Sequence, residues 1–235
     1  MHIDSPTVEM IIQELTRHPV NSNRFFRSFE NEYLDLPQLQ SFLRQYHYFC
    51  KRFVKLLEGL LYKTPLDEIE MRIELTKTLY SELGSGSSER AHVKQLERFA
   101  RALGLTERDL AQTQALPEVD RYLRVLERLF MNSDYLVALG AEMAVETTAA
   151  SEFRYLYPGL QKYEQFSPKD LEFFELHVRE EQQHSDWLVE AVRKTAKTQE
   201  ELTRVAAGAQ ETADAWHDFW QGLDREIFHH SPRPS

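Results

Sequence analysis

Cysteine is almost absent from this sequence: Cys50 is the one copy among 235 residues, which excludes an internal disulfide. A chain without disulfides is typical of a reducing compartment, so we expect a cytoplasmic protein. No run approaches the roughly eighteen apolar residues that a membrane-spanning helix needs. The N-terminus also lacks a basic stretch followed by an apolar one. The sequence therefore predicts neither a membrane span nor a signal peptide.

Basic residues are in the minority as well. The chain has 28 lysines and arginines against 38 aspartates and glutamates, a formal net charge of -10. Phosphate binding needs a basic surface, so nucleic acid is excluded as an expected partner. Hydrophobic residues make up 42% of the chain and charged ones 28%, which is typical of a globular protein rather than a disordered one.

Glycine and proline are scarce, with 8 and 9 copies, and most of them stand where helices are expected to end. Between them apolar residues recur every three or four positions, and no stretch alternates as a strand would. The sequence therefore predicts an all-α fold, with one domain over 1–228 and a disordered tail over 229–235. The expected helices cover residues 6–18, 20–32, 36–63, 65–83, 88–103, 117–133, 134–157, 169–196 and 199–228.

Three potential metal ligands fall on the apolar side of the helix expected over 169–196. At about 100° per residue, the spacing of His177, Glu181 and His184 places these side chains within roughly 60° of one another. Leaving such groups buried without partners would cost several kcal/mol, so other side chains or a cation must satisfy them. A hydrogen-bonded network would explain one core histidine, but three ligand-type residues in one arc favour a metal.

Further carboxylates of this kind lie on other helices. Glu142 and Glu146 both lie near the apolar stripe of the preceding helix, expected over 134–157, and either could bridge two metals. Glu82 ends an earlier apolar stripe, whereas Glu89 stands three residues before His92 and forms a Glu-x-x-His pair with it. Taken alone, Glu142 and Glu146 are each more often half-exposed surface carboxylates than ligands.

Carboxylates combined with imidazoles suit iron, manganese or zinc, and structural zinc would more often recruit thiolates. Several carboxylates shared with three histidines favour a pair of ions, because bridging carboxylates offset two divalent charges. Two Glu-x-x-His pairs are also typical of the ferritin-like di-iron bundles. That comparison leaves Glu82 and His177 without roles.

The ordered set of ligand-type residues resembles the haem-oxygenase-like di-iron oxidases and oxygenases. The pattern is a glutamate, a histidine ten positions later, a lone glutamate and a His-x3-Glu-x2-His group. These residues are Glu82, His92, Glu146, His177, Glu181 and His184. The similarity runs over nearly the whole chain and extends to the thiaminase-like and pyrroloquinoline-quinone-synthesis proteins of the wider family.

The resemblance implies a haem-oxygenase-like helical bundle whose six ligands hold two Fe(II) ions, with manganese an alternative in one site. It implies oxygen-dependent chemistry on a small organic substrate, such as an amino acid or a fatty acid, with no catalytic residue beyond the ligands. An external electron donor is compatible with that chemistry, and we expect a homodimer. One branch makes p-aminobenzoate from its own tyrosine and lysine; Val145 and Leu156 replace residues characteristic of that branch, which argues against self-consuming chemistry here.

Two other functions stay open. A metal-free thiaminase-like hydrolase would need a nucleophile, and Cys50 is the only thiol. A non-enzymatic iron-binding helical bundle would take up metal without a substrate-triggered reaction. Metal analysis and oxygen-consumption kinetics separate these functions from an oxidase.

We predict Glu82 rather than Glu89 as the first carboxylate ligand. In a continuous helix Glu89 and His92 would share a face, but the glycines and serines of residues 84–88 should break the helix. Glu89 then falls in the first turn of the next helix, where the helix dipole favours a carboxylate without any metal. A metal-bound structure with Glu89 on iron and Glu82 in solvent would restore the ferritin-like alternative.

Overall fold

The computed structural model describes residues 6–229, apart from the side chains of residues 180–187. Every regular element within the described residues is helical, and the predicted all-α class is confirmed. In chain order the elements are α1 (Val8–Arg17), η1 (Pro19–Ser22), α2 (Arg24–Asn31), α3 (Leu36–Lys63), α4 (Ile69–Glu82), η2 (Ser88–Arg90), α5 (His92–Ala102), α6 (Glu107–Ala111), α7 (Pro117–Glu127), η3 (Arg128–Asn132), α8 (Tyr135–Gln161), α9 (Glu172–Thr195), α10 (Gln199–Asp224) and η4 (Arg225–His229).

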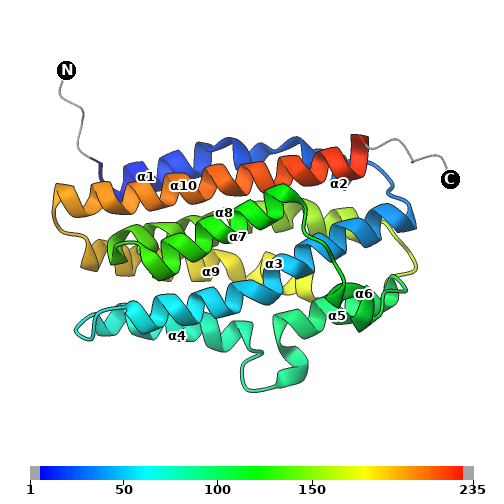
Figure 1. The fold of residues 1–235 in the computed structure, drawn as a ribbon, viewed down its shortest axis with the longest axis horizontal. Helices are drawn as coiled ribbons and strands as arrows, with labels where there is room; N and C mark the ends of the chain where they lie inside the picture. The colour runs from blue at the N-terminus through cyan, green and yellow to red at the C-terminus, as the bar shows by residue number, and fades with distance from the viewer. Residues whose placement is uncertain (1–5, 230–235) are drawn as a thin grey trace.

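The long helices run roughly along the longest axis of the molecule (Figure 1). In this view α1 and α10 lie along the top, α4 lies at the bottom, and α7, α8 and α9 lie between them. Helix α3 slants from the right side down to the lower left, where it meets α4. Helix α8 packs against both α9 and α10, while α4 packs against α3 and α9. Because α8 has neighbours on several sides, it is the central helix of the bundle.

Helices α8 and α10 approach each other closely at two glycines. A Cβ atom at Gly140 would lie 1.9 Å from the backbone oxygen of Val205, and one at Gly208 would lie 1.9 Å from that of Val137. Only glycine leaves room for backbone against backbone at these points. The contact explains why a glycine occurs inside each helix despite its poor helix propensity.

Helix α8 is longer than the sequence indicates. The expected end at residue 157 rests on Pro158, yet the helix continues to Gln161. Leu156 and Leu160 are fully buried, and a Cβ at Gly159 would lie 2.7 Å from the Phe29 ring. The packing of this last turn outweighs the hydrogen bond that proline removes.

Smaller differences concern the ends of helices. The short helix α6 was not expected, and its Thr106 cap with the reciprocal Asp109 bond explains its formation. The helix expected from residue 88 begins at His92 instead, after the separate turn η2. His229 closes η4, and the rest of the expected tail, 230–235, lies outside the described residues.

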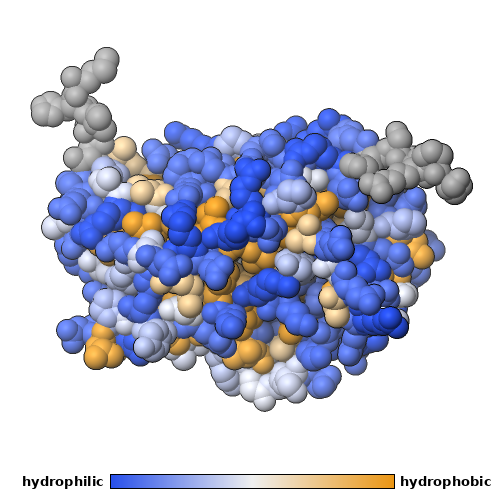
Figure 2. Space-filling view, in the orientation of Figure 1, coloured by the Kyte–Doolittle hydropathy of each residue, from blue (hydrophilic) through white to orange (hydrophobic). Residues whose placement is uncertain are grey.

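Hydrophilic residues cover most of the face drawn in Figure 2, and hydrophobic ones form separate patches between them. Among the described residues, no helix combines the length and the apolar character needed to cross a membrane.

The glycine contact generates a stability prediction. Gly208→Ala should lower the free energy of unfolding by about 3 kcal/mol and the Tm by roughly 6–12 °C, because the new methyl group meets a backbone oxygen. Thermal unfolding by circular dichroism measures the change. Ala207→Ser, at an exposed position of the same helix, is the matched control and should cost less than about 0.5 kcal/mol. An unchanged Tm for Gly208→Ala would contradict the close approach.

Candidate metal centre

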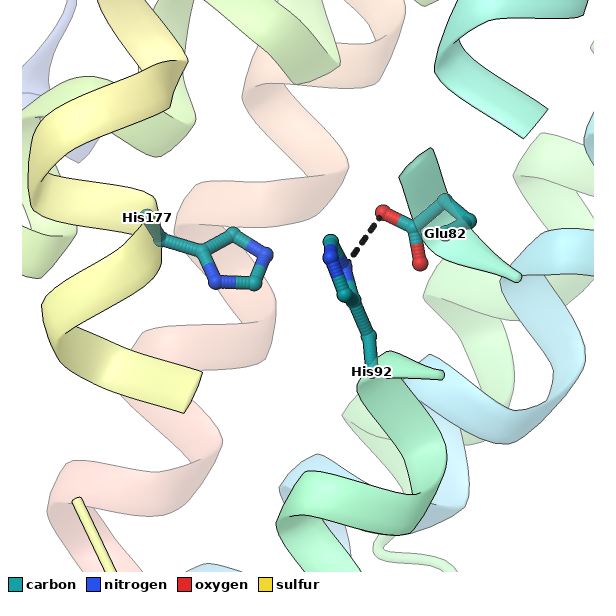
Figure 3. A group of neighbouring side chains, drawn as sticks. All are labelled: Glu82, His92 and His177. Atoms are coloured by element: carbon teal, nitrogen blue, oxygen red, sulfur yellow. Dashed lines mark ion pairs between the residues drawn. The ribbon is translucent and has the colours of Figure 1, made fainter. Parts of the chain in front are cut away.

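Three ligand-type side chains from separate helices meet in the lower half of the bundle. Glu82 is the last residue of α4, His92 the first of α5, and His177 lies in α9. One donor atom from each lies within 4.8 Å of the others. Figure 3 shows His177 and His92 reaching toward each other, with Glu82 on the other side of His92. The Glu82 Oε1 atom lies 3.1 Å from Nδ1 of His92.

The turn between α4 and α5 brings Glu82 and His92 together. Gly84, Ser85 and Gly86 all have positive φ angles, of 86°, 51° and 87°. This left-handed run reverses the chain, so that residues ten apart in sequence face each other. A Cβ at Gly84 would lie 2.2 Å from a backbone oxygen, which makes glycine necessary there. The predicted break at residues 84–88 is confirmed.

The ring of His177 is held in one orientation. Its Nδ1 atom lies 2.6 Å from the carbonyl oxygen of Phe173. A carbonyl only accepts hydrogen bonds, so Nδ1 carries the proton and Nε2 keeps its lone pair. The rings of Phe153 and Phe173 pack on the imidazole at 4.4 and 4.1 Å between centroids. A histidine whose second nitrogen is bonded in this way is typical of metal sites.

Two further glutamates lie beside these side chains. Glu146 of α8 is buried and lines one cavity with Glu82 and His177. Burial and the charge of Glu82 raise the pKa of Glu146 to about 7, although Glu142 and His92 lower it. Burial also raises the pKa of Glu142, and the neighbouring charge of Glu146 raises it further. Protons therefore neutralise part of the charge of this pair in the metal-free protein, and a divalent cation would take their place.

The candidate ligands considered from the sequence fall into three groups. The structure gathers Glu82, His92 and His177, with Glu146 at the edge of the same cavity. Glu89 is exposed in η2, away from this group. Glu181 and His184 belong to α9, but their side chains lie outside the described residues. The complete set of six ligands stays a prediction, as does the choice of Glu82 over Glu89.

A partly open cavity of about 50 Å³ adjoins the centre. Glu82, Glu146 and His177 line it on one side, and aromatic side chains from α3, α7, α8, α9 and α10 form most of the rest. These largely aromatic walls lower the polarity of the space beside the proposed ligands, which strengthens electrostatic interactions there.

Glu152 also lines this cavity, and the sequence analysis missed it. The residue is 2% exposed, and its carboxylate accepts hydrogen bonds from the Tyr46 hydroxyl at 2.8 Å and the Trp216 indole N–H at 2.9 Å. Burial raises the pKa of Glu152 to about 8, although these donors lower it. The sequence does contain a signal for this residue. Residues 135–153 are otherwise uncharged and contain three glutamates, of which Glu152 is one.

Comparison with known proteins identifies the family and the fold of this chain. Residues 40–217 match a family described as iron-containing redox enzyme. A 4-aminobenzoate synthase of Nitrosomonas europaea is 28% identical over 228 residues, covering 92% of this chain and 89% of that protein. A solved CADD-like protein of unknown function from Nostoc punctiforme has a TM-score of 0.78 at 24% identity, covering 93% of this chain and 96% of its own.

A domain of unknown function from Shewanella denitrificans, solved with a heme oxygenase-like fold, has a TM-score of 0.67 at 14% identity. It covers 97% of this chain and 95% of its own. The predicted haem-oxygenase-like bundle is confirmed.

A matched pair of variants tests the choice between Glu82 and Glu89. Glu82→Gln should weaken Fe(II) binding by more than about a hundredfold, whereas Glu89→Gln should leave it unchanged. Helical content should stay the same in both variants. A charged ligand that is buried for function lowers the stability of the metal-free protein, so its removal does not unfold the chain. Anaerobic Fe(II) titration and circular dichroism measure the two quantities. Loss of iron from the Glu89 variant alone would show that Glu89, and not Glu82, binds the metal.

Glu152 generates a prediction on pH. Its folded-state pKa is raised to about 8, so the folded metal-free protein keeps a proton that the unfolded chain loses above about pH 4.5. The resulting stability is complete below pH 4.5 and is lost progressively as pH rises to about 8. Between pH 5 and 8 the wild type should therefore lose about 4 kcal/mol relative to Glu152→Gln.

Denaturant unfolding of both metal-free proteins at each pH measures this difference. Burial lowers the pKa of His47 to about 4, which makes stability rise with pH between about 4 and 6.5. That effect is common to both proteins and cancels in the comparison. Parallel stability curves for the two proteins would contradict the prediction.

Proposed function

The chain belongs to the iron-containing redox enzymes, and on that basis we propose that it is an Fe(II)-dependent oxidase or oxygenase with two iron ions in its centre. The observation that carries this proposal is the meeting of Glu82, His92 and His177 beside a partly open, mostly aromatic cavity. The full proposed ligand set is Glu82, His92, Glu146, His177, Glu181 and His184.

The charges around the centre support two ions. Glu82, Glu146 and Glu181 offset three of the four positive charges of two ferrous ions. Glu142, whose pKa burial and the charge of Glu146 raise, supplies a fourth negative charge when it loses its proton. Oxygen and imidazole donors of this kind suit iron, and manganese is the alternative in one position.

The protein provides binding, orientation and a mostly aromatic environment for the reaction. Iron bound in this centre would supply the electrons that reduce dioxygen. The Phe173 carbonyl fixes the tautomer and direction of His177, and the aromatic walls place a small organic molecule beside the proposed ligands. The cavity volume of about 50 Å³ favours a small substrate or the small reacting end of a longer one.

We propose an external substrate rather than the chain itself. The Nitrosomonas relative is named a 4-aminobenzoate synthase, which makes that product the first one to consider. In the self-consuming branch a tyrosine and a lysine stand at the positions of Val145 and Leu156. Here Val145 lines the cavity and Leu156 is fully buried, so neither position offers a reactive group.

The metal-free hydrolase is the weaker alternative. Cys50, its only candidate thiol, lies in the cavity wall. Burial raises the pKa of this thiol well above its usual range, so the reactive thiolate is scarce at neutral pH. A homodimer, an external electron donor and a cytoplasmic location remain parts of the proposal.

Iron stoichiometry and oxygen consumption test the proposed function. We expect anaerobic titration to saturate near two Fe(II) per chain, with one ion bound more weakly, and an amino acid or fatty acid substrate to accelerate oxygen consumption. Mössbauer spectroscopy counts and characterises the ions, and His177→Ala is the ligand-deficient control. Saturation at one ion indicates a mononuclear enzyme, and zero rejects an iron centre. Iron uptake with no substrate-dependent oxygen consumption favours the non-enzymatic bundle.

A further inference from the structure

Glu152 is a second acidic group in the cavity wall, and it is separate from the proposed metal ligands. It lies on α8, six residues beyond Glu146, and lines the same cavity. Its two hydrogen bonds come from Tyr46 of α3 and Trp216 of α10, at 2.8 and 2.9 Å. Neither donor belongs to the proposed metal centre. The cavity therefore has acidic groups in two parts of a mostly aromatic wall.

The charge of Glu152 has no cationic partner within the described side chains. No lysine or arginine there forms an ion pair with it, and both of its donors are neutral. Glu97, a buried glutamate outside α8, differs in this respect. Its carboxylate lies 2.6 Å from the ammonium group of Lys94 and so has a cationic partner. A buried carboxylate without a cation is unfavourable, and burial accordingly raises the pKa of Glu152 to about 8.

The neighbours of Glu152 hold it in place without using all of its acceptor capacity. An ionised carboxylate offers about four acceptor positions. Tyr46 and Trp216 take two, and the Trp220 indole N–H, which also lowers the pKa of Glu152, takes at most one more. The Trp216 ring packs on Tyr122 at 4.5 Å between centroids, which fixes the direction of its N–H. At least one acceptor position is left for a molecule in the cavity.

We propose that Glu152 binds the ammonium group of a small primary-amine substrate, whose remaining atoms lie along the aromatic wall toward the metal centre. This inference rests on the proposed function and narrows its substrate class. Aromatic faces favour a neighbouring cation, so the same wall contributes to binding. A neutral amine takes the proton of Glu152, and an ammonium ion displaces that proton to solvent. Either route ends in an ammonium–carboxylate pair.

Matched small probes test this assignment. They are n-propylamine, 1-propanol and propionate, which share a chain length and differ in charge at neutral pH. The chain has three tryptophans, and the indole N–H signal of Trp216, assigned with Trp216→Phe, reports directly on the hydrogen bond to Glu152. In the full-length metal-free protein, we expect propylamine to shift this signal saturably, at least tenfold more tightly than propanol. Propionate should bind most weakly.

Variants separate the charge of Glu152 from its packing. Glu152→Gln should lower the propylamine affinity at least tenfold, to that of propanol. Tyr46→Phe keeps the charge and should preserve the preference for the amine. Glu58→Gln, at an exposed position of α3, is the control for a glutamate change elsewhere. If Glu152→Gln does not fold, the wild-type probes decide: equal amine and alcohol affinities overturn the proposal.

Iron titration of the same proteins keeps the two proposals apart. Glu152→Gln should bind as much Fe(II) as the wild type. A wild type that binds two iron ions but shows no preference for the amine overturns the role of Glu152 and leaves the proposed function intact. An amine preference that depends on Glu152, in a protein that binds no iron, supports the amine site and rejects the iron enzyme.

Discussion

The burial of negative charge on one helix is the constraint on which this structure depends. Among the described residues four glutamates are buried, and three of them, Glu142, Glu146 and Glu152, lie on α8. Burial raises the pKa of each, so protons neutralise part of this charge in the metal-free protein. Metal ions at one part of the cavity and an ammonium group at another would replace those protons. The acidic interior thus links the fold to the proposed chemistry.

The fold was largely predictable because most helices are bounded by local signals. Pro37 and the cap of Asp35 mark the start of α3, and its bounds of 36–63 match the prediction. Pro158 is the exception, since a proline predicts a helix end while the buried Leu156 and Leu160 extend the helix beyond it. Tertiary packing of that kind leaves no mark in a single sequence.

The candidate site was predictable in part. The resemblance to a family supplied the ligand-type residues, and the glycines near Gly84 explained how Glu82 and His92 could meet across a break. Helical periodicity could not single out Glu152, because α8 is buried on most of its circumference and its apolar residues do not mark one narrow face. The partners of Glu152 come from α3 and α10, which only the folded chain brings together.

The backbone contact at Gly140 fixes how α8 is rotated about its own axis. The same helix turns its three buried glutamates toward the interior, two, six and twelve residues further along. Inserting or deleting one residue between Gly140 and Glu142 would turn all three carboxyl groups by about 100° relative to that contact. Related proteins can therefore tolerate substitutions in this segment far better than insertions or deletions. Gaps in an alignment of their sequences should fall outside it.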